Sequence, residues 1–104
     1  MSIAKTPKPP YYAVIFTSIH SDDTSGYSEM ATKMATLAAQ QPGYLGIESA
    51  REETGITVSY WRDLESIKQW KNQVAHLEAQ AIGKSRWYTD YTTRIALVER
   101  DYSL

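Results

Sequence analysis

The 104-residue chain contains no cysteine, which excludes disulfide bonds, thiolate metal ligands and cysteine nucleophiles. Its two histidines stand far apart and its five glycines are isolated, so no metal-ligand motif or phosphate-binding loop is present. A net charge of −1 offers no basic field to nucleic acid or an acidic membrane. No apolar run reaches the roughly 18 residues of a membrane span. We therefore expect a cytoplasmic protein with no metal, no nucleic-acid partner and no membrane contact.

Phenylalanine is also scarce, with one Phe against eight Tyr and three Trp. Tyr and Trp each carry a polar atom that needs a partner when it is buried. A core needs only apolar bulk, whereas a pocket or an interface benefits from bulk with a polar tip. The bias is compatible with ordinary packing and with a ligand pocket.

The order of the predicted elements indicates one domain over 11–104, after a flexible, proline-containing lead-in over 1–10. Segments with many β-branched and aromatic residues, separated by turn signals, predict strands at 11–19, 44–50, 56–61 and 87–100. Apolar residues at helical spacing predict one helix that Pro42-Gly43 stops and another that Asp63 caps and Gly83 ends. The order β-α-β-β-α-β predicts an α+β, ferredoxin-like fold, in which two helices cover one face of a four-stranded antiparallel sheet.

Both faces of this sheet are predicted to be apolar, although only one can be covered by helices. The first strand places Tyr11, Ala13 and Ile15 on one face and Tyr12, Val14 and Phe16 on the other. The last strand places Trp87, Tyr91, Ile95 and Leu97 on one face and Tyr88, Ala96 and Val98 on the other. A second copy of the sheet is the simplest cover, which would give a homodimeric α+β barrel. The alternative is an exposed apolar face that binds another protein.

Short motifs along the chain resemble the antibiotic biosynthesis monooxygenase family, and the resemblance covers 11–102. The motifs are Pro42-Gly43-Tyr44-Leu45-Gly46, Tyr60-Trp61, Trp70, His76, Ala79-Gln80, Gly83, Trp87-Tyr88 and Val98-Glu99-Arg100. Similarity to this family implies the dimeric α+β barrel. It also implies oxidation of polycyclic aromatic phenols by molecular oxygen with no flavin, metal or other cofactor, while other relatives bind and degrade haem.

The resemblance implies that Trp70 and His76 are the catalytic pair. Quinone-forming members carry a Trp on the second helix and a Tyr six residues later, and His76 stands at that Tyr position. An imidazole suits a general base. Trp70 also fits the apolar stripe of its helix as a core residue. His76 lies roughly 130° from the centre of that stripe, so it lines a pocket only if the helix bends.

Haem degradation is disfavoured by two departures from the family pattern. Haem-degrading relatives place a Trp and a haem-ligand His ten residues apart, and Gln80 stands at that position after Trp70. They also use an Asn on the first strand, and 11–19 contains none.

Aromatic residues near the strand ends are predicted to line a substrate pocket. Arg94 interrupts an apolar strand face and is predicted to hold an anionic oxygen of the substrate. Arg62, Arg86 and the strand-end residue His20 are expected to be solvated. The predicted pocket residues are Tyr60, Trp61, Trp87, Tyr88, Tyr91 and Arg94.

Three functions stay open at this point. The first is a cofactor-independent monooxygenase of a small quinol- or anthrone-like aromatic. The second is a non-catalytic dimeric module that binds a small hydrophobic molecule. The third is a haem-binding relative.

Overall fold

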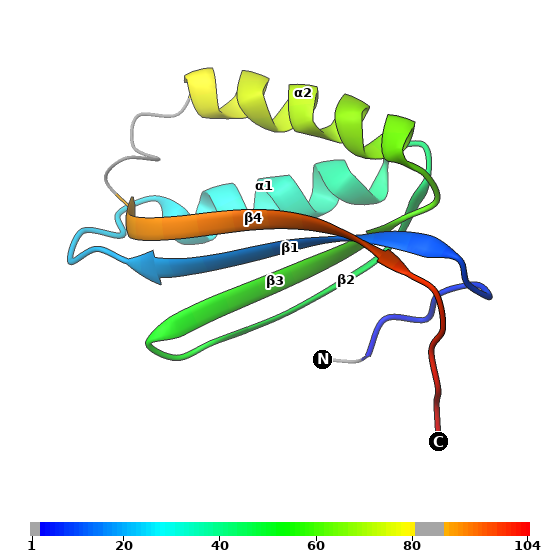
Figure 1. Ribbon diagram of the computed structural model, residues 1–104. Helices are drawn as coiled ribbons and strands as arrows, with labels where there is room; N and C mark the ends of the chain where they lie inside the picture. Colours follow the sequence, from blue (N-terminus) through cyan, green and yellow to red (C-terminus); the bar gives the residue numbers. More distant parts are fainter. Residues whose placement is uncertain (1–2, 81–86) are drawn as a thin grey trace.

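The computed structural model describes residues 3–80 and 87–104, and for 76–80 only the backbone. Its elements follow the predicted order β-α-β-β-α-β, and the four strands form one antiparallel sheet in the order β2-β3-β1-β4. Both helices cover the same face of the sheet (Figure 1). The ferredoxin-like α+β prediction is confirmed. The elements are β1 Tyr11–His20, α1 Tyr27–Ala39, β2 Tyr44–Arg51, β3 Thr54–Trp61, α2 Leu64–Gln80 and β4 Tyr88–Val98.

The two helices begin in different ways, and only α2 begins at the capping residue that the sequence predicts. Asp63 precedes α2, and its carboxylate accepts a hydrogen bond from the Ser66 backbone N–H at 2.8 Å. This N-cap satisfies a donor that the first helical turn would otherwise leave unpaired. The same hydrogen bond is the main reason that the pKa of Asp63 is lowered. α1 begins differently, because Gly26 occupies its N-cap in a left-handed conformation and makes no side-chain cap. No helix in the described ranges is long and apolar enough to cross a membrane.

The core lies between the sheet and the helices at the end where β3 runs into α2. Trp61 is fully buried and its ring stacks on Trp70 of α2, with centroids 5.7 Å apart and planes 25° apart. The Trp61 indole N–H donates to the Ser59 hydroxyl at 2.8 Å, so burial leaves no polar atom of this ring unpaired. Ala38 and Ile67 complete the buried cluster. Trp70 is therefore a core residue at least in part, as the apolar stripe predicted.

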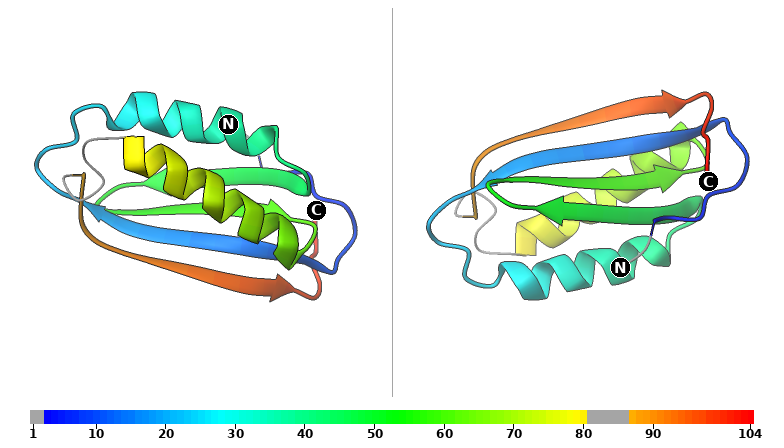
Figure 2. Two further views of the ribbon diagram at one scale, coloured as in Figure 1. Left: turned by 90° about the horizontal axis from the view of Figure 1, so that it is seen from above. Right: turned by 90° about the horizontal axis from the view of Figure 1, so that it is seen from below.

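The helices leave strand β4 uncovered. Seen from above, α1 lies beyond the β2 edge, α2 crosses the middle of the sheet, and β4 forms the opposite edge (Figure 2). Ile95 and Leu97 pair with Val14 and Tyr12 and so lie on the helix-facing side, yet they are 53% and 50% exposed. An apolar strip therefore lines the open side between α2 and β4.

The other face of the sheet, called the outer face below, is partly covered by the N-terminal segment. The Ala4 backbone N–H donates to one carboxylate oxygen of Glu48 at 2.9 Å, and the Tyr60 hydroxyl donates to the other at 2.6 Å. Tyr11 joins both ends of the chain, because its hydroxyl accepts from Thr6 at 3.0 Å and donates to Asp101 at 2.6 Å. The flexibility of 1–10 stays a prediction, and Ala4 and Thr6 contact the sheet.

Beyond that corner the outer face remains apolar. The register places Ala13, Ile15, Val58 and Ala96 side by side on it. Ile19 and Ile56 on the same face are each 45% exposed. Apolar surface is therefore present on both sides of the sheet, as the strand pattern predicted.

One prediction about β4 is wrong. Its residues do not alternate regularly, because a bulge breaks the pairing with β1: Asp90 pairs with Ile19, whereas Tyr88 pairs with His20. Thr89 is the extra residue, which shifts Tyr88, the strand residue before it, to the opposite face. Tyr88 therefore lies on the same, helix-facing side as Tyr91, and not on the opposite face as strict alternation required.

Candidate functional site

Six rings from four segments gather on the helix-facing side of the sheet, around the bulge. Neighbouring ring centroids in this aromatic cluster lie between 4.3 and 6.0 Å apart. Most neighbouring pairs meet edge to face, an arrangement that favours aromatic contacts. The rings belong to Phe16 and His20 of β1, Tyr27 of α1, Trp87, and Tyr88 and Tyr91 of β4.

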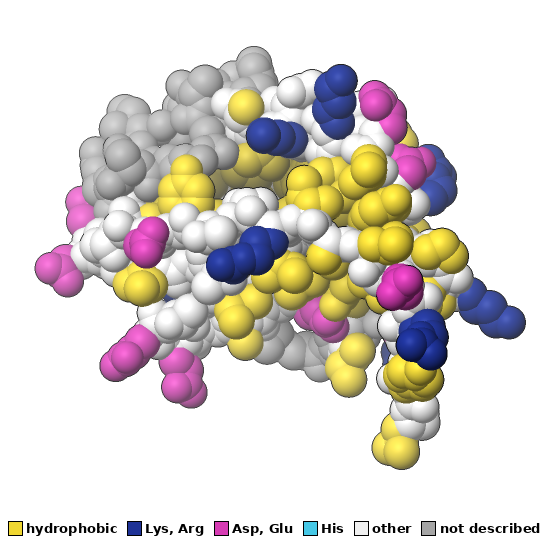
Figure 3. Space-filling model, viewed as in Figure 1, with side chains coloured by type: hydrophobic (Ala, Val, Ile, Leu, Met, Phe, Trp, Pro, Cys, Tyr) yellow, Lys and Arg dark blue, Asp and Glu magenta, His cyan; other side chains and the backbone are white. Residues whose placement is uncertain are grey.

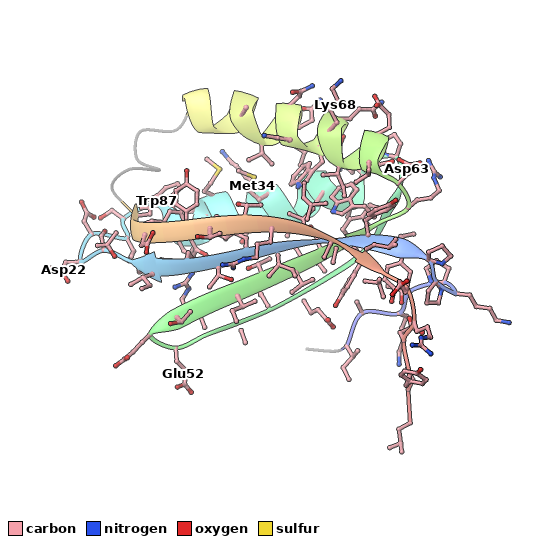
Figure 4. The ribbon with its side chains drawn as sticks, in the orientation of Figure 1. Asp22, Met34, Glu52, Asp63, Lys68 and Trp87 are labelled. Carbon is pink, nitrogen blue, oxygen red and sulfur yellow. The ribbon has the colours of Figure 1, made fainter. Side chains whose placement is uncertain are left out.

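The bulge and two hydrogen bonds hold the cluster together. The Ser21 backbone N–H donates to the Trp87 carbonyl at 2.7 Å, which ties the end of β1 to the residue before β4. The Trp87 indole N–H donates to the Ser25 carbonyl at 2.7 Å, which ties the same residue to the start of α1. Figure 4 shows Trp87 and Met34 of α1 in the layer between the sheet and the helices.

The surface is hollowed beside this cluster, between α2 and β4, with hydrophobic side chains in and around the hollow (Figure 3). Tyr91 is 43% exposed, so the cluster is open to solvent at its β4 side. Ile95 extends the same apolar wall along the strand. The arrangement provides flat apolar surfaces for an aromatic ligand and an open side through which it can enter.

His20 belongs to this cluster, and the prediction that it is a solvated loop residue is wrong. It is the last residue of β1, and its ring meets Tyr27 edge to face at 4.3 Å and lies 5.5 Å from Tyr88. Its Nε2 atom is buried and has no hydrogen-bond partner in the described part of the chain. Burial, and secondarily the positive charge of Arg51, lowers the pKa of His20. The imidazole is therefore favoured in its neutral form.

Arg51 supplies a fixed positive charge beside the cluster. Its guanidinium donates to the side-chain and backbone oxygens of Ser18, which is buried on the same strand face as His20. The guanidinium carbon lies 6.0 Å from the centroid of the Tyr27 ring, within the range of a cation–π contact. Sequence reasoning considered other arginines and missed this one. The useful signal is the register of the β2–β3 hairpin, which places Arg51 on the helix-facing side.

The structure divides the predicted site residues into three places. Trp87, Tyr88 and Tyr91 lie in the aromatic cluster. Trp61 and Trp70 lie in the core. Two others lie on the outer face, namely Tyr60 and Arg94.

The two residues on the outer face have different surroundings. Tyr60 donates to Glu48, and burial together with this carboxylate raises the pKa of Tyr60 to about 12. Arg94 is exposed and pairs in register with Ile15. Neither faces the aromatic cluster of its own chain.

The remaining charged candidates are Arg62, Arg86 and His76. Arg62 is exposed and forms an ion pair with Asp63 at 3.3 Å, so it is solvated as predicted. Arg86 and the side chain of His76 lie outside the described residues. The α2 backbone is helical from Leu64 to Gln80, through the position of His76. In the ranges that the structure describes, no three His, Asp or Glu side chains lie close enough to hold a metal ion.

Comparison with known proteins decides the family. The family model described as antibiotic biosynthesis monooxygenase matches residues 10–82. The chain belongs to the antibiotic biosynthesis monooxygenase family. The chain is also similar to the uncharacterized protein YqjZ of Bacillus subtilis (strain 168). The two are 50% identical over 100 residues, which cover 94% of this chain and 88% of YqjZ.

Solved structures share the fold of this antibiotic biosynthesis monooxygenase family member. SnoaB, a cofactor-independent oxygenase from Streptomyces nogalater, matches with a TM-score of 0.66 at 16% identity and covers 92% of this chain and 98% of its own. The heme-degrader MhuD from Mycobacterium tuberculosis, solved with two hemes in its active site, matches with a TM-score of 0.58 at 18% identity. This match covers 88% of the present chain and 99% of the MhuD chain. At these identities the matches establish the ferredoxin-like fold alone.

Proposed function

We propose that this protein is a cofactor-independent monooxygenase that acts on a small hydroxylated aromatic, quinol- or anthrone-like. The observation that carries the proposal is the aromatic cluster beside an open apolar hollow, in a chain of the antibiotic biosynthesis monooxygenase family. Similarity in fold to the cofactor-independent oxygenase SnoaB supports it.

In this reaction the protein supplies substrate binding and proton transfer. A base removes a proton from the substrate, and the resulting anion donates an electron to molecular oxygen. Radical recombination forms a carbon–oxygen bond, and loss of water converts the CH₂ group and O₂ into a carbonyl and H₂O. Both oxygen atoms come from O₂, one in the carbonyl and one in water, and the electrons that reduce O₂ come from the CH₂ group, so the balance requires no other reactant. The rings of Trp87, Tyr88 and Tyr91 would bind the flat substrate and exclude water.

In this proposal Trp70 and His76 remain the catalytic candidates. The Trp70 ring is half-buried and stacks on Trp61, which fixes its orientation and makes it a rigid wall. His76 would serve as the base. Tyr60 and Arg94 would bind substrate only if a second copy brings them to a site, because both lie on the outer face.

We further propose that two copies pair through their outer faces to form an α+β barrel. The outer face carries apolar residues from three strands, and the N-terminal segment covers only one corner of it. Two exposed isoleucines on a sheet surface favour burial against a like surface. The paired residues would include Ala13, Ile15, Ile19, Ile56, Val58 and Ala96.

The test is oxygen uptake by the purified protein with a tricyclic anthrone. We expect protein-dependent uptake that falls about a hundredfold or more in His76→Ala, the size of effect expected for loss of a general base. Arg62→Ala is the matched control, because the Arg62 side chain is exposed and its ion pair is with Asp63, which lies outside the aromatic cluster. Its uptake should equal that of the unmodified chain.

Absence of uptake would contradict the proposal for this substrate class. If the anthrone still bound, the result would support a non-catalytic module for small hydrophobic ligands. Stoichiometric haem binding without anthrone binding would instead support a relative of the haem-binding type, despite Gln80.

A further inference from the structure

His20 is a titratable side chain of the aromatic cluster to which the proposed reaction assigns no role. Its Nε2 atom is buried and unpaired among the described residues. The edge-on contact with Tyr27 supplies at most a weak interaction with the ring face, which does not replace a hydrogen bond. Buried polar atoms are nearly always paired in folded proteins, so an unpaired one calls for an explanation.

The groups around His20 favour an acceptor role. The side chains packed against it are Tyr27 of α1 and Tyr88 of β4, and the charged group that acts on it is Arg51 of β2. A neutral imidazole offers one ring nitrogen as a hydrogen-bond acceptor. Arg51 disfavours a proton on His20 by itself, but the same charge favours an anion nearby. A charged imidazole is therefore favoured only when an anion is present.

We propose that His20 Nε2 accepts the hydrogen bond, and then the proton, of the ligand's aromatic hydroxyl group, and that Arg51 stabilises the aryloxide. This inference rests on the proposed function and deepens it, because it adds an acceptor on β1 for the hydroxyl proton, while His76 stays the candidate base for the carbon-bound proton. One O–H bond breaks and one N–H bond forms. The oxygen keeps the electron pair, so an aryloxide and an imidazolium result and no other reactant is needed.

Neighbouring contacts hold both groups in place. Arg51 is fixed by two hydrogen bonds to Ser18, which lies two residues before His20 on the same face of β1. His20 is fixed between the two tyrosine rings, and the bulge at Thr89 places one of them there. A ligand that enters beside the exposed ring of Tyr91 would reach the imidazole by displacing aromatic contacts.

The test compares two ligands that differ in one hydrogen-bond donor. Isothermal titration of the full chain, without oxygen, would measure binding of 1-naphthol and of its methyl ether, 1-methoxynaphthalene. We expect about a tenfold preference for the naphthol in the unmodified chain. His20→Phe keeps a ring of similar size, so it should bind the ether about as well and lose the preference.

The other histidine of the chain provides the sharpest comparison. His76→Phe should keep the naphthol preference if His20 is the acceptor. A preference that persists in His20→Phe would overturn the proposal, and so would a preference that disappears only in His76→Phe.

A second measurement avoids any variant that fails to fold. The imidazole nitrogen resonances of the unmodified, ¹⁵N-labelled protein should shift at His20 Nε2 with 1-naphthol and not with the ether. Equal shifts with both ligands, or none, would overturn the assignment. Neither measurement uses oxygen, so a naphthol preference without anthrone oxidation would contradict the proposed reaction and leave the His20 assignment standing. Anthrone oxidation at an unchanged rate in His20→Phe would contradict the His20 assignment and leave the proposed reaction standing.

Discussion

Two glycines with nearly the same backbone conformation provide a test of how tightly α1, β2 and α2 are joined. Gly26 has φ +80° and Gly43 has φ +82°, a region that costs other residues about 1–2 kcal/mol. A Cβ at Gly26 would meet nothing closer than 3.8 Å. A Cβ at Gly43 would lie within 2.6 Å of the Ser66 Cβ and closer still to its hydroxyl oxygen. Both Gly→Ala changes therefore carry the free-energy cost of a positive φ, but only the methyl group at Gly43 would collide with a neighbouring side chain.

We therefore expect Gly26→Ala to lower the free energy of unfolding by about 1–2 kcal/mol. Gly43→Ala should lower it by about 2–5 kcal/mol, since overpacking adds about 1–3 kcal/mol to the same backbone term. The measurement is urea unfolding followed by tryptophan fluorescence, with all variants at one protein concentration because pairing of copies would add to the apparent stability.

Ser66→Gly gives the control that isolates the collision. It removes both atoms that the new methyl group would meet, so the double variant should be more stable than the sum of the single changes predicts, by about 1–3 kcal/mol. Equal losses for Gly26→Ala and Gly43→Ala, or additive effects in the double variant, would refute the reasoning.

Three further predictions concern charge and pairing. Because the pKa of His20 is lowered from 6.5, its stabilising effect is present above pH 6.5 and lost as pH falls through the folded-state pKa; pH-dependent urea unfolding should show this loss, and His20→Phe should remove it. Because the pKa of Tyr60 is raised from 10.0 to about 12, its contribution is present below pH 10 and lost as pH rises through about 12; tyrosinate absorbance should show a late-titrating group near pH 12 that Glu48→Gln shifts to lower pH. Ile56→Glu should shift sedimentation from dimer towards monomer, whereas Leu64→Glu, a change at a somewhat more exposed residue at the start of α2, should not; identical behaviour would contradict pairing through the outer face.

The fold could be predicted from the sequence because its signals are local and regular. Helical spacing, the Asp63 cap and the Pro42-Gly43 stop each fix one element without reference to the rest of the chain. Element order then leaves few topologies for a small α+β chain. The apolar pattern on both strand faces also predicted correctly that helices would cover only part of the apolar surface.

The site was predicted less well because it depends on register. Strict alternation put Tyr88 on the wrong face, since a bulge cannot be read from residue types alone. The position of His20 at the strand end predicts a solvated loop residue, although counting by twos from Val14 and Phe16 places it on the helix-facing side. Arg51 was missed because its position depends on pairing between β2 and β3, not on its neighbours in sequence.

The single extra residue in β4 also affects how relatives should be aligned. Thr89 is left out of the residue-by-residue pairing between β4 and β1, so a relative that lacks it would keep both flanking tyrosines on the same face. A relative of equal length whose strand pairs without a bulge would turn the residue equivalent to Tyr88 away from the aromatic cluster. A one-residue gap at this point can therefore preserve the site, whereas an ungapped match can conceal its loss.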